Sequence, residues 1–88
     1  MEEDDLKVGM AFKDNNDEDY LIITDIDYRD EYDETRVAFR YHDNLKRLLN
    51  EESSGSDDMP MDNFMEYIDD GTYTLVPTAI NWKKRLDQ

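Results

Sequence analysis

The 88-residue chain contains no cysteine, one histidine, two prolines and three glycines. Without cysteine the chain has no disulfide framework, no thiolate metal site and no thiol nucleophile. No serine or cysteine nucleophile motif stands beside His42, and no P-loop, G-x-S-x-G or H-E-x-x-H pattern occurs. We therefore expect neither catalysis nor a bound cofactor, and we interpret His42 as a loop residue in contact with solvent.

Long apolar runs are also missing. None approaches the ~20 residues of a membrane-spanning helix, and the acidic opening MEEDDLK lacks the basic and apolar regions of a signal peptide. These absences, with the lack of disulfides, predict a soluble protein of the cytoplasm.

Basic residues are scarce. Ten Lys and Arg face 24 Asp and Glu, for a formal net charge of -14. The imbalance is uneven, because residues 1–34 hold 14 acids and residues 51–70 hold eight acids and no base. A surface this acidic repels nucleic acids and anionic membranes and attracts basic proteins. The commonest basic surfaces in a cell are those that bind nucleic acids.

High charge with low hydropathy is typical of disorder, but the apolar residues of this chain come in dense runs. These runs are YLIITDI at 20–26, VAFRY at 37–41, NFMEYI at 63–68 and TYTLV at 72–76. They predict one folded domain over residues 7–76. We expect a disordered acidic N-terminus at 1–6 and a tail at 77–88.

Three strands are predicted in the first half of the domain. Residues 7–12 alternate with Val8, Met10 and Phe12 on one side and Gly9 at a bend. Residues 20–28 place Tyr20, Ile22, Thr24, Ile26 and Tyr28 on one face, and Leu21, Ile23, Asp25 and Asp27 on the other. Residues 35–41 direct Val37, Phe39 and Tyr41 inward. Polar loops separate the strands at 14–19 and 29–34.

The second half is predicted to hold a helix and a last strand. A short helix through Leu45, Leu48 and Leu49, capped by Asp43, is one interpretation of the segment after His42, and an extended segment is the other. Residues 51–59 are expected to form a flexible acidic loop. Residues 62–70 form a helix with an apolar stripe that ends at Gly71, and residues 72–76 form a strand that ends at Pro77.

The tail from Thr78 is interpreted as a short helix. Thr78 would cap it, and Ile80, Trp82 and Leu86 would form its apolar side. The basic trio Lys83 to Arg85 could pair with an acidic patch on a second copy, which would favour a homodimer.

This order of elements predicts an α+β fold that is mostly β, a small SH3-like antiparallel barrel or rolled sheet with a short helix before the last strand. The segments KVGMAF, YLIITDI, TRVAFRY and DNFMEYIDDGTYTLV resemble small SH3-like barrel proteins of bacteriophages. The resemblance covers roughly residues 7–76 and rests mostly on core positions.

A calcium loop is the one metal site that the spacing suggests. Asp14, Asn16, Glu18 and Asp25 fall at positions 1, 3, 5 and 12 of an EF-hand loop. However, Asp19 stands where the loop needs glycine, and a strand follows where a helix is required. We therefore expect no metal site.

The acidic segments are the candidate binding surface. Asp25 and Asp27 point the same way on a strand, about 6.6–6.8 Å apart, on the scale of neighbouring phosphates along a nucleic-acid strand. Asp62, Glu66 and Asp69 form one exposed helical stripe. The candidate partner-binding residues are Asp17, Glu18, Asp19, Asp25, Asp27, Asp30, Glu31, Tyr32, Asp33, Glu34, Asp62, Glu66, Asp69 and Asp70.

A small acidic domain of this organisation resembles the bacteriophage DNA-mimic proteins that disable host factors. The resemblance implies a basic DNA-binding protein of a bacterial host as partner, with the nucleoid protein HU as the first expectation. Arg36 and Arg40 could pair with Asp25 or Asp27 and move this surface toward residues 29–34 and the helix. The alternative is a non-mimetic interaction module that docks through an apolar face around Tyr28, Tyr32 and the tail. Acidic runs that serve solubility alone are the plainest interpretation.

Overall fold

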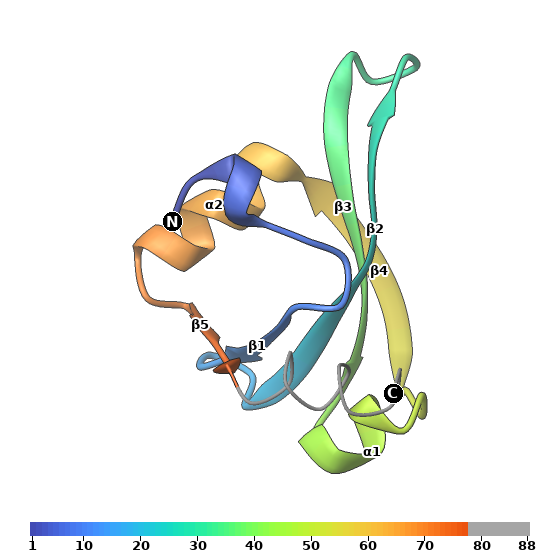
Figure 1. Cartoon of the computed structure of the whole chain (residues 1–88), viewed down its shortest axis with the longest axis vertical. Helices are drawn as coiled ribbons and strands as arrows, with labels where there is room; N and C mark the ends of the chain where they lie inside the picture. Colours follow the sequence, from blue (N-terminus) through green and yellow to red (C-terminus); the bar gives the residue numbers. More distant parts are fainter. Residues whose placement is uncertain (78–88) are drawn as a thin grey trace.

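Residues 1–77, which a computed structural model describes, form one curled antiparallel sheet of five strands (Figure 1). The strands are β1 (Ala11–Asp14), β2 (Asp19–Arg29), β3 (Glu34–His42), β4 (Gly55–Pro60) and β5 (Tyr73–Leu75). A 3-10 helix (Glu3–Asp5) precedes β1, α1 (Leu45–Leu49) links β3 to β4, and α2 (Met61–Asp69) links β4 to β5.

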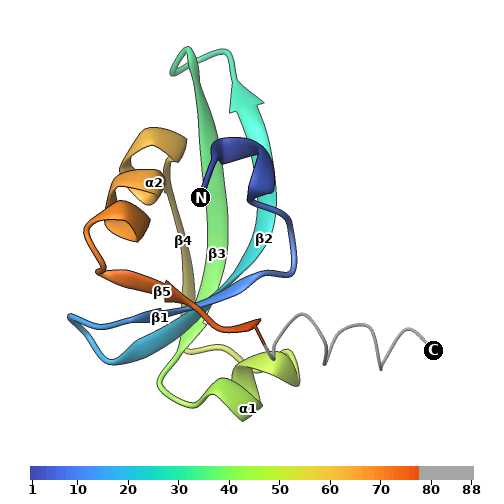
Figure 2. The same cartoon turned by 60° about the vertical axis from the view of Figure 1, so that its left-hand side comes forward.

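The strand order is β4-β3-β2-β1-β5, so within residues 1–77 the edge strands β4 and β5 do not pair with each other. The helix α2 connects these edges and contacts β3, β4 and β5. Figure 2 shows α2 beside the curled sheet, with α1 at the opposite end of the molecule from the β2–β3 hairpin. The predicted fold class is confirmed in its rolled-sheet form, because the barrel does not close.

Phe64 of α2 lies at the centre of the core and is fully buried. Its ring centroid is 5.4 Å from that of Phe12, 6.2 Å from that of Phe39 and 5.1 Å from that of Tyr73. These three partners come from β1, β3 and β5, so one side chain ties the helix to both halves of the sheet. The predicted apolar stripe of this helix is confirmed, and Gly71, at a φ of 86°, follows its end.

The alternation of β2 changes at a bulge that the sequence did not predict. The pairing of β2 with β3 shifts register between Ile23 and Asp25, so Thr24 is the extra residue. Ile26 therefore packs against the same core as Leu21 and Ile23. The prediction that Ile26 shares a face with Ile22 was wrong, and Asp25 and Asp27 lie on the outer face of the sheet instead.

The N-terminal segment reaches the core. Residues Glu3–Asp5 form a 3-10 helix, and the next residue, Leu6, is 4% exposed and belongs to the core. The disorder expected at 1–6 stays a prediction, and burial of Leu6 attaches the end of this segment to the core. Val8, expected on the same side of a strand as Met10 and Phe12, is exposed in a turn around Gly9, where φ is 94°, and the strand starts only at Ala11.

Two predictions for residues 42–59 also need correction. The short helix exists, but its N-cap is Asn44 rather than Asp43, and the Asn44 side chain accepts a hydrogen bond from the Arg47 amide. The expected acidic loop becomes β4 from Gly55 onward, paired with Arg36–Tyr41 of β3. Backbone pairing along an exposed edge produces this strand, and its side chains are too polar to indicate one.

The predictions for the tail, including the helix capped by Thr78 and the trio Lys83 to Arg85, fall outside the described residues. Within residues 1–77, no helix has the length and apolar character needed to cross a membrane.

Added salt should stabilise the fold. With a net charge of -14, the carboxylates repel one another in the folded state, and salt screens this repulsion as the Debye length falls from about 30 Å at 0.01 M to about 8 Å at 0.15 M. We expect the melting temperature, followed by circular dichroism, to rise with sodium chloride. An unchanged melting temperature over that range would show that the repulsion is not significant.

Candidate protein-binding surfaces

The β2–β3 hairpin extends beyond the rest of the sheet (Figure 1). On one side β1 pairs only with Asp19–Ile22, and on the other β4 pairs only from Arg36 onward. We call residues 25–36 the hairpin arm. It contains six carboxylates but only two guanidinium groups, at Arg29 and at its base in Arg36.

The arm carries its predicted acidic residues in two places. Asp25 and Asp27 precede and follow Ile26 in β2. Ile26 points to the core, and both aspartates are exposed on the outer face. Asp30, Glu31 and Asp33 lie in the four-residue loop after the last strand pair, Arg29 with Glu34, and all three are exposed. The bulge at Thr24 thus directs the strand carboxylates away from the core and leaves them open to a partner.

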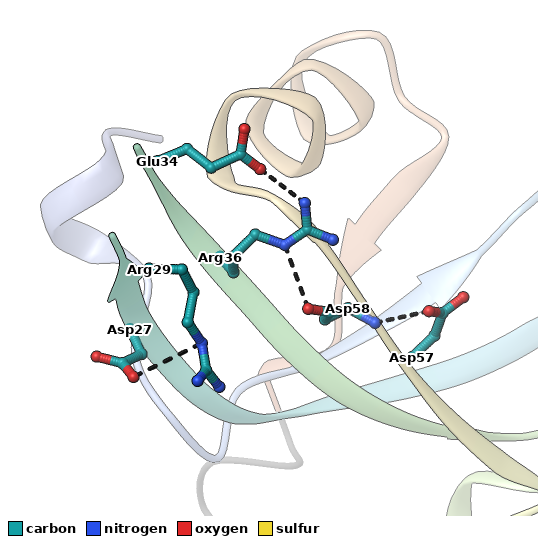
Figure 3. A network of polar contacts seen from close by, with 6 residues as sticks. All are labelled: Asp27, Arg29, Glu34, Arg36, Asp57 and Asp58. Carbon is teal, nitrogen blue, oxygen red and sulfur yellow. Dashed lines mark hydrogen bonds and ion pairs between the residues drawn. The ribbon is translucent and has the colours of Figure 1, made fainter. Parts of the chain in front are cut away.

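The guanidinium of Arg36 makes a different set of ion pairs from the one expected (Figure 3). It lies 2.6 Å from the Glu34 carboxylate and 3.2 Å from the Asp58 carboxylate of β4. Hydrogen bonds raise the pKa of Arg36, and the bond to Asp58 contributes more than the bond to Glu34. The expected pairing of Arg36 with Asp25 or Asp27 was wrong. Asp27 instead lies 3.8 Å from Arg29, in an exposed ion pair of the kind that contributes little stability.

Two exposed tyrosines lie among these acids. Tyr28 is 52% and Tyr32 59% exposed. The Tyr28 hydroxyl donates a hydrogen bond to Asp33, which raises the Tyr28 pKa, and the Arg36 guanidinium lies 5.0 Å from the Tyr32 ring centroid. Large aromatic side chains on an exposed surface supply the packing that carries binding energy in many interfaces.

The β3 side of the arm, where this strand begins, faces the N-terminal ends of both the chain and α2. A depression of about 240 Å³ is lined there by Glu3, Asp33, Glu34, Thr35, Pro60, Met61 and Asp62. The structure therefore brings Asp33 and Glu34 of the arm together with Asp62. Sequence reasoning missed Glu3, because its segment was expected to be disordered.

The remaining acids of α2 are exposed but play unequal parts. Asp62, Glu66 and Asp69 form the predicted exposed stripe. Asp70 follows the helix, and its carboxylate accepts a hydrogen bond from the Thr72 amide at 2.8 Å. Hydrogen bonding to Thr72 lowers the Asp70 pKa, so this residue serves the turn into β5.

Asp17, Glu18 and Asp19 lie at the opposite end of β2 from the arm loop. They belong to the β1–β2 turn and the start of β2, so the predicted acidic residues form two separate surfaces. Beside this turn is a cavity of about 350 Å³, which we call the open-end pocket. Its carboxylates are Asp14, Asp17, Asp19 and Asp57, and its other walls are Leu21, Phe39, Tyr41, Met59 and Tyr73.

Sequence reasoning missed Asp14 and Asp57 because strand register brings them to this pocket. Asp14 pairs with both Asp19 and Tyr73, and Asp57 pairs with the buried Phe39. Asp57 thus lies on the inner side of the sheet at its edge. An alternation of Asp57 with Met59, opposite Phe39 and Val37, was the signal that could have identified it.

Tyr73 lines this pocket, and its ionisation in alkali should lower the stability of the folded protein. Burial, and then the negative charge of Asp14 and other neighbours, raises the pKa of Tyr73 from 10.0 to about 12. The folded state holds this proton more tightly than the unfolded state, so the stabilisation is complete below about pH 10 and is lost toward pH 12. Urea unfolding across this range should show a decline that Tyr73→Phe reduces. Parallel profiles for the two proteins would assign the decline to other groups.

Within residues 1–77, no group of three His, Asp or Glu side chains converges closely enough to hold a metal ion, and the suggested calcium-loop residues instead span a β-hairpin. Comparisons with protein-family models, curated proteins and solved structures gave no match.

Proposed function

We propose that this protein binds a basic DNA-binding protein through the hairpin arm and occupies the surface that the partner uses for DNA. The observation that carries the proposal is the projection of the arm beyond the sheet, with Asp25, Asp30 and Glu31 outside any ion pair within residues 1–77. The protein acts in this proposal as a binding protein in the bacterial cytoplasm, without catalysis or a cofactor.

The arm suits a partner that recognises charge and shape. Arg and Lys side chains that normally contact phosphates would make charge-assisted hydrogen bonds to its carboxylates. Tyr28 and Tyr32 add apolar contact area among these charges. A nucleoid protein such as HU is the first candidate because proteins of this kind bind DNA with little dependence on base sequence.

The mechanism is competitive. The negative potential of the whole molecule accelerates encounter with a basic surface, and the arm then excludes DNA from that surface. Salt weakens the complex because it screens the attraction between the two charged surfaces. Glu3 and Asp62 extend the acidic surface from the arm toward α2.

Competition binding with purified HU tests the proposal. We expect HU to bind the immobilised protein, to be displaced by excess duplex DNA, and to bind more weakly as sodium chloride is raised. Binding that survives both DNA and high salt would refute DNA mimicry and indicate docking through the aromatic residues. Absence of binding to HU would exclude HU as the target.

A further inference from the structure

The open-end pocket has the composition of a site for an organic cation. Its volume of about 350 Å³ falls at the small end of the range of ligand pockets in proteins, which begins at about 300 Å³. All five strands contribute to its lining, so the sheet itself holds its walls in place. The pocket lies at the other end of β2 from the loop of the hairpin arm, and the inference does not rest on the arm.

The apolar side of the pocket is aromatic and well positioned. Phe39 and Tyr73 are 6% and 7% exposed, and Tyr73 also contacts the rings of Phe64 and Tyr67. The Tyr41 ring lies over Gly55 of β4, where a Cβ atom would lie only 2.5 Å from the Tyr41 hydroxyl oxygen. Glycine at this position therefore lets Tyr41 cross the edge strand and form a wall.

The polar side of the pocket is negative. Asp14, Asp17, Asp19 and Asp57 line it, and none of them forms an ion pair within residues 1–77. Two of these carboxylates already accept backbone hydrogen bonds, Asp14 from the amides of Asn16 and Asp17 and Asp57 from the amide of Asp58. The pocket therefore concentrates negative charge beside aromatic faces without a cation from the described chain.

A buried polar group also points to a ligand. Tyr73 is more than nine-tenths buried and lines the pocket, yet its hydroxyl has no hydrogen-bond partner among residues 1–77. The large majority of polar atoms on buried side chains have a hydrogen-bond partner, either in the protein or in ordered water. The charges of Asp14, Asp17 and Asp57 act on this hydroxyl strongly enough to contribute to its raised pKa. A donor from outside could bond to the hydroxyl and to the carboxylates together.

We propose that the open-end pocket binds the side chain of an arginine presented by a basic polypeptide. The planar guanidinium stacks on aromatic rings and donates several hydrogen bonds in a fixed fork, so it can use Tyr41, Tyr73 and two carboxylates at once. The aliphatic stem of arginine would lie along Leu21 and Met59. A bare metal ion fits less well, because no three ligating side chains of residues 1–77 converge there.

The test uses the full-length protein labelled with ¹⁵N and titrated with N-acetyl-arginine methylamide. Saturable chemical-shift changes confined to the pocket, at Leu21, Tyr41, Asp57 and Tyr73, are expected. The uncharged isostere N-acetyl-citrulline methylamide should bind at least about tenfold more weakly, because its neutral ureido group lacks the positive charge that strengthens hydrogen bonds to carboxylates and contacts with aromatic faces. Equal binding of citrulline would overturn the proposal, and equal binding of the lysine analogue would overturn the preference for arginine.

A matched pair of variants separates the pocket from general attraction to acid. Asp17→Asn with Asp57→Asn should weaken arginine binding at least about tenfold. Asp30→Asn with Glu31→Gln removes the same charge from the arm. This variant should keep the arginine affinity of the pocket within about twofold, because salt screens charges as far away as the arm loop. Equal losses in the two variants would overturn the proposal. Because all four positions are exposed, both variants are expected to fold.

A third variant tests whether the chain fills its own pocket. Lys83→Gln, Lys84→Gln and Arg85→Gln remove the basic residues of the tail together. Unchanged pocket resonances and unchanged arginine affinity support an external occupant. Shifts at Tyr41 and Tyr73 without added ligand, together with tighter arginine binding, would identify the tail as the occupant and overturn the proposal.

Discussion

Replacement of Asp30 and Glu31 by lysine should abolish the proposed partner binding while the protein remains folded. Both side chains are exposed in the arm loop, and neither forms a hydrogen bond or ion pair within the described residues, so the fold does not depend on them. In the complex, two lysines would face the basic surface of the partner, and like charges in an interface are strongly unfavourable. We expect the dissociation constant for HU to rise at least about 100-fold.

The choice of these two positions follows from the contacts of the arm. Asp33 accepts the hydrogen bond of the Tyr28 hydroxyl, and Glu34 pairs with Arg36. Replacement of Asp33 or Glu34 would remove contacts that hold the arm in shape. A loss of binding could then not be distinguished from a loss of structure. Isothermal titration calorimetry measures the affinity, and circular dichroism melting confirms that the variant folds.

Glu51→Lys with Glu52→Lys provides the control. These exposed residues follow α1, at the opposite end of the molecule from the arm, and their replacement changes the net charge by the same amount. The control variant should associate with HU only modestly more slowly and keep most of its affinity, because only the long-range electrostatic attraction between the two proteins changes. A control that loses as much affinity as the arm variant would show that net charge, rather than the arm, carries the binding.

The sequence predicted the fold where apolar residues alternate or recur without interruption. Val37, Phe39 and Tyr41 on β3, and Phe64, Met65 and Ile68 on α2, all pack in or against the core as expected. The prediction failed on β2 after Thr24, because a bulge reverses the faces and no residue pattern marks it.

Elements with few apolar side chains were the hardest to predict. The strand β4 has the sequence GSDDMP and was expected to be a loop, because an exposed edge strand is held by backbone pairing. Leu6 is a single apolar residue in an acidic segment, so it forms no pattern, yet it is buried. A lone residue of this kind becomes part of the core only through tertiary contacts.

The same limit applies to the candidate surfaces. The acids of the arm are close in sequence, so their common location could be predicted from the hairpin alone. The open-end pocket combines Asp14, Asp19 and Asp57 from three strands, with β4 and β1 separated by β3 and β2 in the sheet. Their proximity depends on the strand register and the curl of the whole sheet, and neither can be predicted from the distribution of charge along the sequence.

Phe64→Ala should produce the largest loss of stability in the molecule. Truncation of a buried phenylalanine costs about 3–5 kcal/mol of unfolding free energy, against a total of about 5–15 kcal/mol for a typical domain. Phe64 is fully buried and its ring contacts rings on β1, β3 and β5, so the cavity cannot collapse without moving several strands. Urea unfolding followed by circular dichroism measures the loss.

Tyr67→Ala is the matched control on the same helix. Tyr67 is 38% exposed and its ring packs only against Tyr73 among the described rings, so its truncation should cost about 1 kcal/mol. Equal losses for the two variants would contradict the central position of Phe64. Because α2 bridges edge strands that do not pair with each other in the described chain, loss of the Phe64 anchor should also loosen the packing of α2 against β4 and β5. Amide exchange should therefore rise first in α2 and β5, while the β2–β3 pairing, the longest in the sheet, remains the most protected.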